Sequence, residues 1–143
     1  MQIPTPKVGH VISYSYVWRH EYEAGRREGA KNRPVMIVLA SHRDETGRTI
    51  VTVAPITHSP PSDPAGAVEI WPRTKERLGL DGERSWIIID DLNIFTWPGY
   101  DLQPVPGRAE TCLYGPLPAE LIRQVQTTIA RRHRVLTRSN RDE

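Results

Sequence analysis

The sequence has almost no cysteine, since Cys112 is the only one among its 143 residues. A single cysteine cannot form an intrachain disulfide, and it excludes a zinc cluster built from several cysteines and histidines at the usual ligand spacing. We therefore expect a protein of a reducing compartment that needs no metal ion and no cofactor. The length suits one domain over residues 1–143, with a core held by apolar packing alone.

Long apolar runs are also missing. Residues 1–7 lack the apolar run of a signal peptide, and no later segment approaches the roughly 20 apolar residues that cross a bilayer. We expect a soluble, cytoplasmic protein with no membrane partner. The sequence further lacks an internal repeat, a phosphate-binding glycine loop, a dinucleotide fingerprint and a Gly-x-Ser-x-Gly motif, which disfavours common nucleotide-binding and serine hydrolase chemistry.

What the sequence does contain is a series of short β-rich segments between turns rich in proline and glycine. Short runs of β-branched and aromatic residues predict strands. The predicted strands cover residues 8–17, 35–40, 49–56, 67–70 and 85–90, and residues 93–97 extend or pair with the last of these. Segments 35–40 and 49–56 are predicted to pair antiparallel. Prolines make residues 58–66 a surface loop and residues 98–115 an irregular crossing segment.

Two helical segments are expected. A single turn covers residues 73–78 and ends at Gly79, and a longer helix covers residues 117–135 with a proline in its first turn. In the longer helix an apolar stripe recurs at helical spacing, formed by Leu121, Ile122, Val125 and Ile129. Residues 136–143 would be a frayed tail. The order of elements predicts a mainly β, α+β domain: a small antiparallel barrel or sheet with a C-terminal helix.

Positive charge is unevenly distributed, although the formal net charge is only +2. Residues 18–32 contain few apolar side chains and are expected to form a mobile, basic loop. Aromatic and histidine side chains alternate there with cations, a composition that stacks unpaired bases and binds phosphates. The candidate RNA-binding residues are Trp18, His20, Arg26, Arg27 and Lys31. A merely solvated connection would have the same composition.

The order of motifs along the chain resembles the PemK/MazF family of toxin–antitoxin ribonucleases. The matching pieces are GHVI at residues 9–12, NRPVMIVL at 32–39, VAPIT at 53–57 and SWIIID at 85–90, followed by the C-terminal helix. Each motif is weak by itself, but their order and spacing cover nearly the whole domain.

The resemblance implies an SH3-like antiparallel β-barrel that forms a symmetric homodimer. It also implies a toxin of a type II toxin–antitoxin system that cleaves single-stranded RNA, such as mRNA, at short sequences and is silenced by a cognate antitoxin. The family's functional arginine and threonine correspond to Arg33 and Thr57, and the acid that some members use corresponds to Asp90. Two positions depart from the pattern: Ile88 replaces an arginine, and Arg26 replaces a histidine.

Metal-independent RNA cleavage needs a base, an acid and a cation while the ribose 2′-hydroxyl attacks its own phosphate. Arg33 suits the cationic role, because its guanidinium stays charged and offers forked donors to phosphate oxygens. Thr57 offers a hydroxyl at a strand end. His58 is the first candidate for the proton carrier, but adjacent strand residues point to opposite faces, so it joins Thr57 only if the strand breaks there. His20 ranks second.

The sequence does not decide which residues are the acid and the base. The candidates are those two histidines and the carboxylates of Asp90 and Asp91. Either carboxylate could orient Arg33 or act as the base, and an aspartate pair that only forms a turn is at least as good an interpretation. Two other classes of function compete with the ribonuclease. One is a non-catalytic barrel that binds nucleic acid or gyrase, and the other is a structural or adaptor barrel with no toxin role.

Overall fold

The structure is a computed structural model that describes residues 1–16, 32–42, 45 and 47–140. Most of the expected basic loop lies outside these residues, and with it all five candidate RNA-binding residues: Trp18, His20, Arg26, Arg27 and Lys31. Asn32, the last residue assigned to that loop, instead begins a strand.

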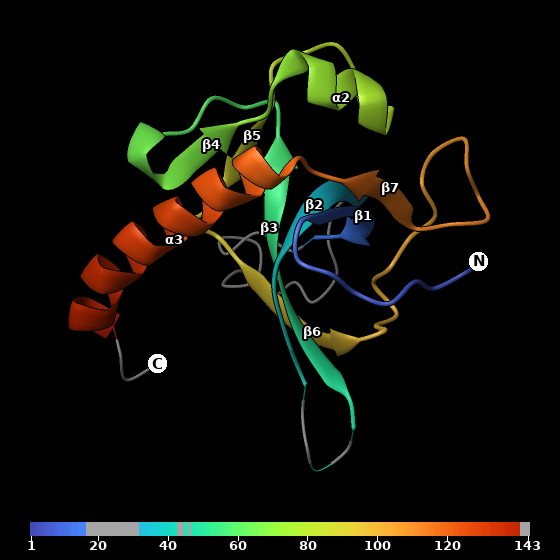
Figure 1. Cartoon of the computed structure of the whole chain (residues 1–143), viewed down its shortest axis with the longest axis horizontal. Coiled ribbons are helices and arrows are strands. Elements are labelled where there is room, and N and C mark those ends of the chain that lie inside the picture. Colours follow the sequence, from blue (N-terminus) through green and yellow to red (C-terminus); the bar gives the residue numbers. More distant parts are fainter. Residues whose placement is uncertain (17–31, 43–44, 46, 141–143) are drawn as a thin grey trace.

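An antiparallel sheet forms the body of the molecule (Figure 1). Its strands are β1 (His10–Ser15), β2 (Asn32–His42), β3 (Thr49–Thr57), β4 (Ala67–Glu69), β5 (Trp86–Ile88), β6 (Asn93–Trp97) and β7 (Leu113–Pro116). Their order is β4-β5-β3-β2-β1-β7, and β6 pairs with β3. Among the described residues no pairing joins β4 to β7, so the mainly β fold class is confirmed while closure into a barrel stays a prediction.

The central pair β2–β3 forms as the sequence predicts, with Val35 opposite Pro55 and Ala40 opposite Val51. The apolar run in β2 is continuous because its alternate residues enter different parts of the core. Met36 packs with Leu121 and Val125 of the C-terminal helix, whereas Ile37 packs in a second cluster that contains Tyr14, Val53 and Trp97. Both faces of β2 are therefore buried from Val35 to Val38.

The helices differ from expectation mainly at their ends. Helix α2 (Pro72–Leu78) ends at Gly79, whose φ of 77° is the left-handed conformation that favours glycine. Helix α3 (Ala119–Asn140) begins later and runs further than the expected 117–135, because no glycine or proline interrupts residues 136–140. Residues 136–140, which the sequence predicts to be a frayed tail, continue this helix. A short 3-10 helix, η1 (Pro64–Gly66), lies within the expected loop 58–66.

The edge strand β7 differs from the sequence prediction, because it starts inside the segment 98–115 that is predicted to be irregular. It pairs antiparallel with β1, where His10 faces Pro116 and Ile12 faces Leu113. The first strand is also shorter than predicted and spans His10–Ser15. In the described part of the chain, no helix is long and apolar enough to span a membrane.

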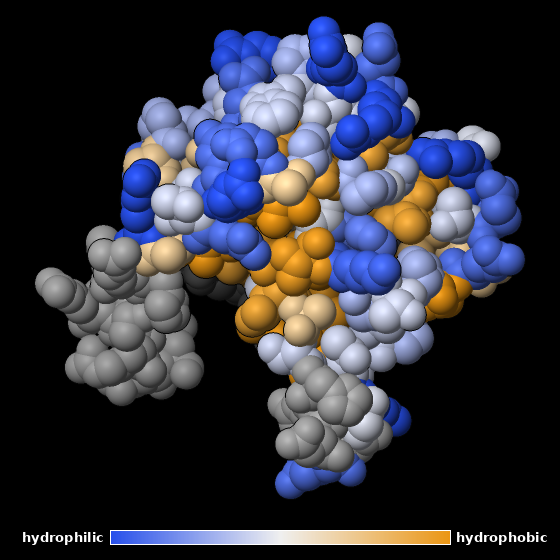
Figure 2. All heavy atoms as spheres, in the orientation of Figure 1, coloured by the Kyte–Doolittle hydropathy of each residue, from blue (hydrophilic) through white to orange (hydrophobic). Residues whose placement is uncertain are grey.

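An apolar row crosses the outer side of the sheet. Leu39 of β2 pairs with Thr52 of β3, which pairs with Ile94 of β6, so the three residues lie side by side. Leu39 is 53% exposed and Ile94 is 69% exposed. In the view of Figure 2, hydrophilic side chains surround an apolar area in the middle of the face. The sheet thus leaves some apolar surface open to solvent.

Candidate active site

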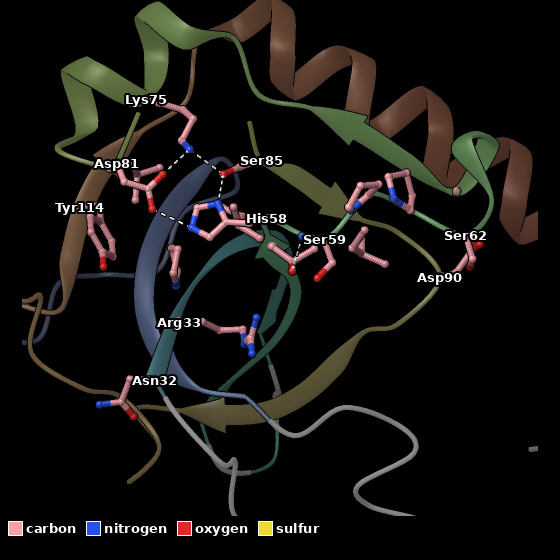
Figure 3. A pocket seen from close by; sticks show the side chains of 18 of the residues that line it. Asn32, Arg33, His58, Ser59, Ser62, Lys75, Asp81, Ser85, Asp90 and Tyr114 are labelled. Atoms are coloured by element: carbon pink, nitrogen blue, oxygen red, sulfur yellow. Dashed lines mark hydrogen bonds and ion pairs between the residues drawn. The ribbon is translucent and has the colours of Figure 1, made fainter. Parts of the chain in front are cut away.

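A cavity of about 910 Å³ lies at the ends of β2, β3 and β5 (Figure 3). Four residues proposed from the sequence line it: Arg33, Thr57, His58 and Asp90. The strands bring these residues together although they are spread over more than 50 positions of the chain. The candidate RNA-binding residues cannot be compared in the same way, because they lie outside the described residues.

Arg33 and Thr57 come from neighbouring strands. Arg33 is the second residue of β2 and faces Tyr14 of β1, and Thr57 is the last residue of β3. The backbone N–H of Ser59 donates to the Thr57 hydroxyl oxygen at 3.2 Å, a local turn that ends the strand. Because the strand ends there, His58 is released from strand alternation and enters the same cavity as Thr57.

His58 contacts a polar group at each of its ring nitrogens. Nε2 lies 2.6 Å from Oδ2 of Asp81, and Nδ1 lies 3.2 Å from the Ser85 hydroxyl and 3.3 Å from the carbonyl oxygen of Arg84. The side chains of His58 and Asp81 are 48% and 49% exposed, so solvent still reaches them. The arrangement orients an imidazole that remains open to a ligand.

Lys75 of α2 connects the groups around His58, although its own side chain is only 4% exposed. Its ammonium donates to Asp81 Oδ1 at 2.8 Å, to the Ser85 hydroxyl oxygen at 2.6 Å and to the carbonyl oxygen of Glu83. A buried lysine is stable only when such acceptors surround it. Lys75 therefore fixes the segment 81–85 against α2.

The carboxyl group of Asp81 is ionised at neutral pH. Burial acts to raise its pKa, but hydrogen bonds from the Lys75 ammonium and the Glu83 backbone N–H, with the charges of Lys75 and His58, lower the pKa below its usual value. Asp81 is therefore a hydrogen-bond acceptor for His58 and Lys75 at physiological pH.

Asp90 lines the cavity and is paired with Arg132, a cation that was not among the predicted site residues. Nε of Arg132 in α3 donates to Asp90 Oδ1 at 3.0 Å, and the same guanidinium lies 3.1 Å from Asp63 Oδ2. The hydrogen bond to Asp90 is the main reason that the pKa of Arg132 is raised. The Asp90–Arg132 pair ties α3 to the cavity wall.

Asp91, the other carboxylate proposed as acid or base, also accepts hydrogen bonds. The hydroxyl of Tyr16 donates to Asp91 Oδ1 at 2.6 Å and to the Asp91 carbonyl oxygen at 2.5 Å. Asp91 is absent from the cavity lining, so among the acid and base candidates in the described residues His58 has the best access.

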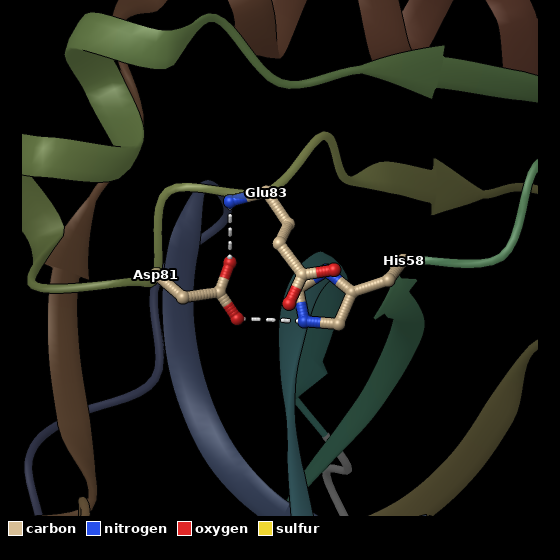
Figure 4. Close-up of side chains that lie close together, drawn as sticks. All are labelled: His58, Asp81 and Glu83. Atoms are coloured by element: carbon tan, nitrogen blue, oxygen red, sulfur yellow. Dashed lines mark hydrogen bonds and ion pairs between the residues drawn. The ribbon is translucent and has the colours of Figure 1, made fainter.

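The described residues include one group whose composition resembles a cation site: His58, Asp81 and Glu83, with ligand atoms within 4.8 Å of one another (Figure 4). The Lys75 ammonium lies 2.8 Å from Asp81 Oδ1 and already supplies a positive charge that balances these carboxylates. We therefore assign no metal site there.

A comparison with models of protein families shows the family of the chain. A family model of PemK-like, MazF-like toxins of type II toxin–antitoxin systems matches residues 16–98, which is more than half of the chain. This chain belongs to that family. No curated protein matches it. The PemK/MazF match contains the four proposed cavity residues Arg33, Thr57, His58 and Asp90, whereas α3 and its Arg132 lie beyond the matched range.

Three residues of this PemK/MazF cavity were not among the predicted site residues: Lys75, Asp81 and Ser85. Asp81 stands in a segment that is typical of a polar turn, and Ser85 was predicted only as the first residue of a strand. A signal for Lys75 was present, because it precedes the buried Leu78 by three positions and therefore lies on the same face of α2. A lysine on the apolar face of a short helix indicates a buried, partnered ammonium.

Proposed function

We propose that this protein is an endoribonuclease toxin that cleaves single-stranded RNA without a metal ion. The observation that carries the proposal is that Arg33, Thr57 and His58 line one cavity, which brings together a fixed cation, a hydroxyl and an imidazole. These are the groups that an attack by the ribose 2′-hydroxyl on its own phosphate requires. Membership of a toxin family supports the proposal.

In this mechanism the 2′-oxygen forms a bond to phosphorus while the bond from phosphorus to the 5′-oxygen breaks. His58 takes the proton from the 2′-hydroxyl, and the 5′-oxygen receives a proton from solvent in the open cavity. Arg33 stabilises the negative charge that develops on the phosphate oxygens, and Thr57 donates a hydrogen bond to one of them. The products are a 2′,3′-cyclic phosphate and a 5′-hydroxyl end.

Asp90 is a weaker candidate for the base than His58, because the Arg132 guanidinium donates to both of its oxygens. Its proposed role is to hold the cavity wall. Ile88 also lines the cavity, at the position where the resemblance leads us to expect an arginine. Arg33 is therefore proposed as the main cation for the scissile phosphate.

The partners belong to the same proposal. We infer that the toxin acts in the cytoplasm on mRNA, forms a homodimer on an SH3-like barrel and is silenced by an antitoxin. Trp18, His20, Arg26, Arg27 and Lys31 remain the candidates for binding the RNA. The exposed apolar row that contains Leu39 and Ile94 supports association with another protein surface.

The test is to incubate the purified protein with a long single-stranded RNA in the presence of a chelator. We expect cleavage at a short sequence, with 2′,3′-cyclic phosphate ends detected by mass spectrometry. Arg33→Ala and Thr57→Ala should each lower the rate by about 100-fold or more, in line with the loss of a group that stabilises the transition state. Arg73→Ala, a change to an exposed cation of α2, is the matched control.

A second candidate is a toxin-like protein that binds nucleic acid or gyrase without cutting RNA. The isoleucine at position 88 and the Asp90–Arg132 pair favour it, because both remove charged groups that could act on a phosphate. Intact RNA after incubation with wild-type protein, together with a mobility shift of that RNA or inhibition of gyrase, would support this candidate and exclude the ribonuclease.

A further inference from the structure

The hydrogen bonds around His58 form a closed ring. Lys75 contacts both Asp81 and Ser85, and these two residues contact opposite nitrogens of the His58 ring (Figure 3). The ring therefore joins a buried ammonium on α2 to an exposed imidazole at the end of β3. Among these groups only the imidazole can both take up and release a proton near neutral pH.

The chemistry of Lys75 and Asp81 sets the direction of the hydrogen bonds that these two residues make. An ammonium has only donors and an ionised carboxylate has only acceptors. The His58 nitrogen that lies 2.6 Å from the Asp81 carboxylate must therefore carry a hydrogen, which makes it Nε2–H. The Ser85 oxygen accepts from Lys75 at 2.6 Å, so its single hydrogen is available to donate to Nδ1 of His58.

We propose that Lys75 is the positioning residue of the site, which holds His58 in the Nε2–H tautomer with the lone pair on Nδ1. This inference rests on the proposed ribonuclease function and deepens it, because it names Nδ1 as the nitrogen that takes the proton from the 2′-hydroxyl. The RNA hydroxyl then takes the place of the Ser85 hydroxyl. Once Nδ1 is protonated it can donate to the carbonyl oxygen of Arg84, 3.3 Å away.

Burial explains why a lysine can hold this position. The ammonium of Lys75 is almost inaccessible to water and is surrounded by oxygen acceptors from the segment 81–85. In an exposed lysine, water would compete for these acceptors and fixing the side chain would cost conformational entropy. Because the acceptors include a backbone carbonyl, Lys75 orders the main chain of the segment as well as the side chains of Asp81 and Ser85.

The test uses the full-length protein labelled with nitrogen-15 histidine, with the His58 signals assigned by comparison with His58→Gln. Long-range proton–nitrogen spectra at a pH where His58 is neutral report which ring nitrogen carries the hydrogen. We expect Nε2–H in the wild type. In Lys75→Met and Ser85→Ala we expect a mixture of tautomers. Arg73→Met, on the same helix but exposed, should reproduce the wild-type spectrum.

Kinetics provide the second readout, measured on an RNA oligonucleotide that contains the cleavage sequence. Lys75→Met should lower kcat by about tenfold or more, the scale of an impaired proton transfer, while KM changes by less than about twofold. A wild-type spectrum with Nδ1–H, or a Lys75→Met protein that keeps both the Nε2–H tautomer and kcat, would overturn the proposal. If Lys75→Met fails to fold, Ser85→Ala decides through the same measurements.

The two experiments separate failure of this inference from failure of the proposed function. The tautomer of His58 is measured without RNA, so it is decided even if the protein cleaves no RNA. Cleavage by wild type together with an unchanged tautomer and an unchanged kcat in both variants would leave the ribonuclease intact and exclude Lys75 as its positioning residue.

Discussion

The hydroxyl of Tyr16 donates to the carboxylate of Asp91 at 2.6 Å and so joins the residue after β1 to the segment between β5 and β6. Tyr16 is 1% exposed, and its hydroxyl finds acceptors in both the side chain and the carbonyl of Asp91. The pair links two segments that are distant in sequence, and it anchors one end of the segment that contains the candidate RNA-binding residues.

Replacement of Tyr16 by phenylalanine should destabilise the protein by about 1–3 kcal/mol, because a charge-assisted hydrogen bond is lost and the acceptors at Asp91 lose their donor. Urea unfolding followed by tryptophan fluorescence measures the change. Tyr100→Phe is the matched control, because Tyr100 is 81% exposed and should tolerate the same substitution within experimental error. Equal stabilities of the two variants would contradict the assigned role of the Tyr16 hydroxyl.

The same tyrosine predicts how stability depends on alkaline pH. Burial, followed by the hydrogen bond and charge of Asp91, raises the pKa of Tyr16 well above the ordinary value of 10.0. Tyr16 therefore ionises at a lower pH in the unfolded chain than in the folded protein. The stability that this difference contributes is fully present below pH 10 and is lost as the pH rises above it. The melting temperature of wild type should fall above pH 10, and more steeply than that of Tyr16→Phe. Parallel curves would exclude the effect.

Two glycines offer a test of the cavity wall. A Cβ at Gly66 would lie 2.0 Å from Oδ2 of Asp90, whereas a Cβ at Gly82 would meet no atom within 4 Å. Gly66→Ala should push Asp90 away from its position and cost about 1–3 kcal/mol of stability, the range for overpacking. Gly82→Ala should be close to neutral. Urea unfolding of both variants measures the difference in stability. A Gly66→Ala protein as stable as wild type would show that Asp90 can move without cost.

The pair between Asp90 and Arg132 predicts a dependence of the cavity on α3. Arg132→Gln removes the donors to Asp90 and Asp63 together and should lower the melting temperature and the rate of RNA cleavage. Its neighbour Arg131, which is exposed, supplies the control Arg131→Gln with the same change in charge. The prediction is wrong if both glutamine variants melt and cleave alike.

Much of the central sheet was predictable, because its strands carry strong local signals. The apolar runs of β2 and β3 predict their own pairing, and the prolines after His58 predict the break that brings this residue beside Thr57. Strand β7 was missed because Gly115 and Pro116 read as turn formers, and only β1 supplies the partner that makes this segment a strand. Edge strands of this kind depend on tertiary contacts more than on their own sequence.

The polar network of the cavity was less predictable than its cation. Arg33 follows from a motif within one strand, whereas Lys75, Asp81 and Ser85 acquire their roles only when α2 packs over the end of β3. The partner of Asp90 was missed for the same reason, since Arg132 is 42 positions away in sequence. Long-range electrostatic pairing leaves no period in the sequence, so pattern reasoning does not detect it.

The turn in which the Ser59 N–H binds the Thr57 hydroxyl places two consecutive residues in one cavity, although an unbroken strand would separate them on opposite faces. The toxin is therefore vulnerable to a change of backbone length at this point. A one-residue insertion that lets β3 continue would turn His58 away from the cavity, although the sequence would still contain both Thr57 and His58. In the proposed mechanism an insertion or deletion at this turn would therefore abolish cleavage, and a comparison of residue identities alone would not reveal the loss.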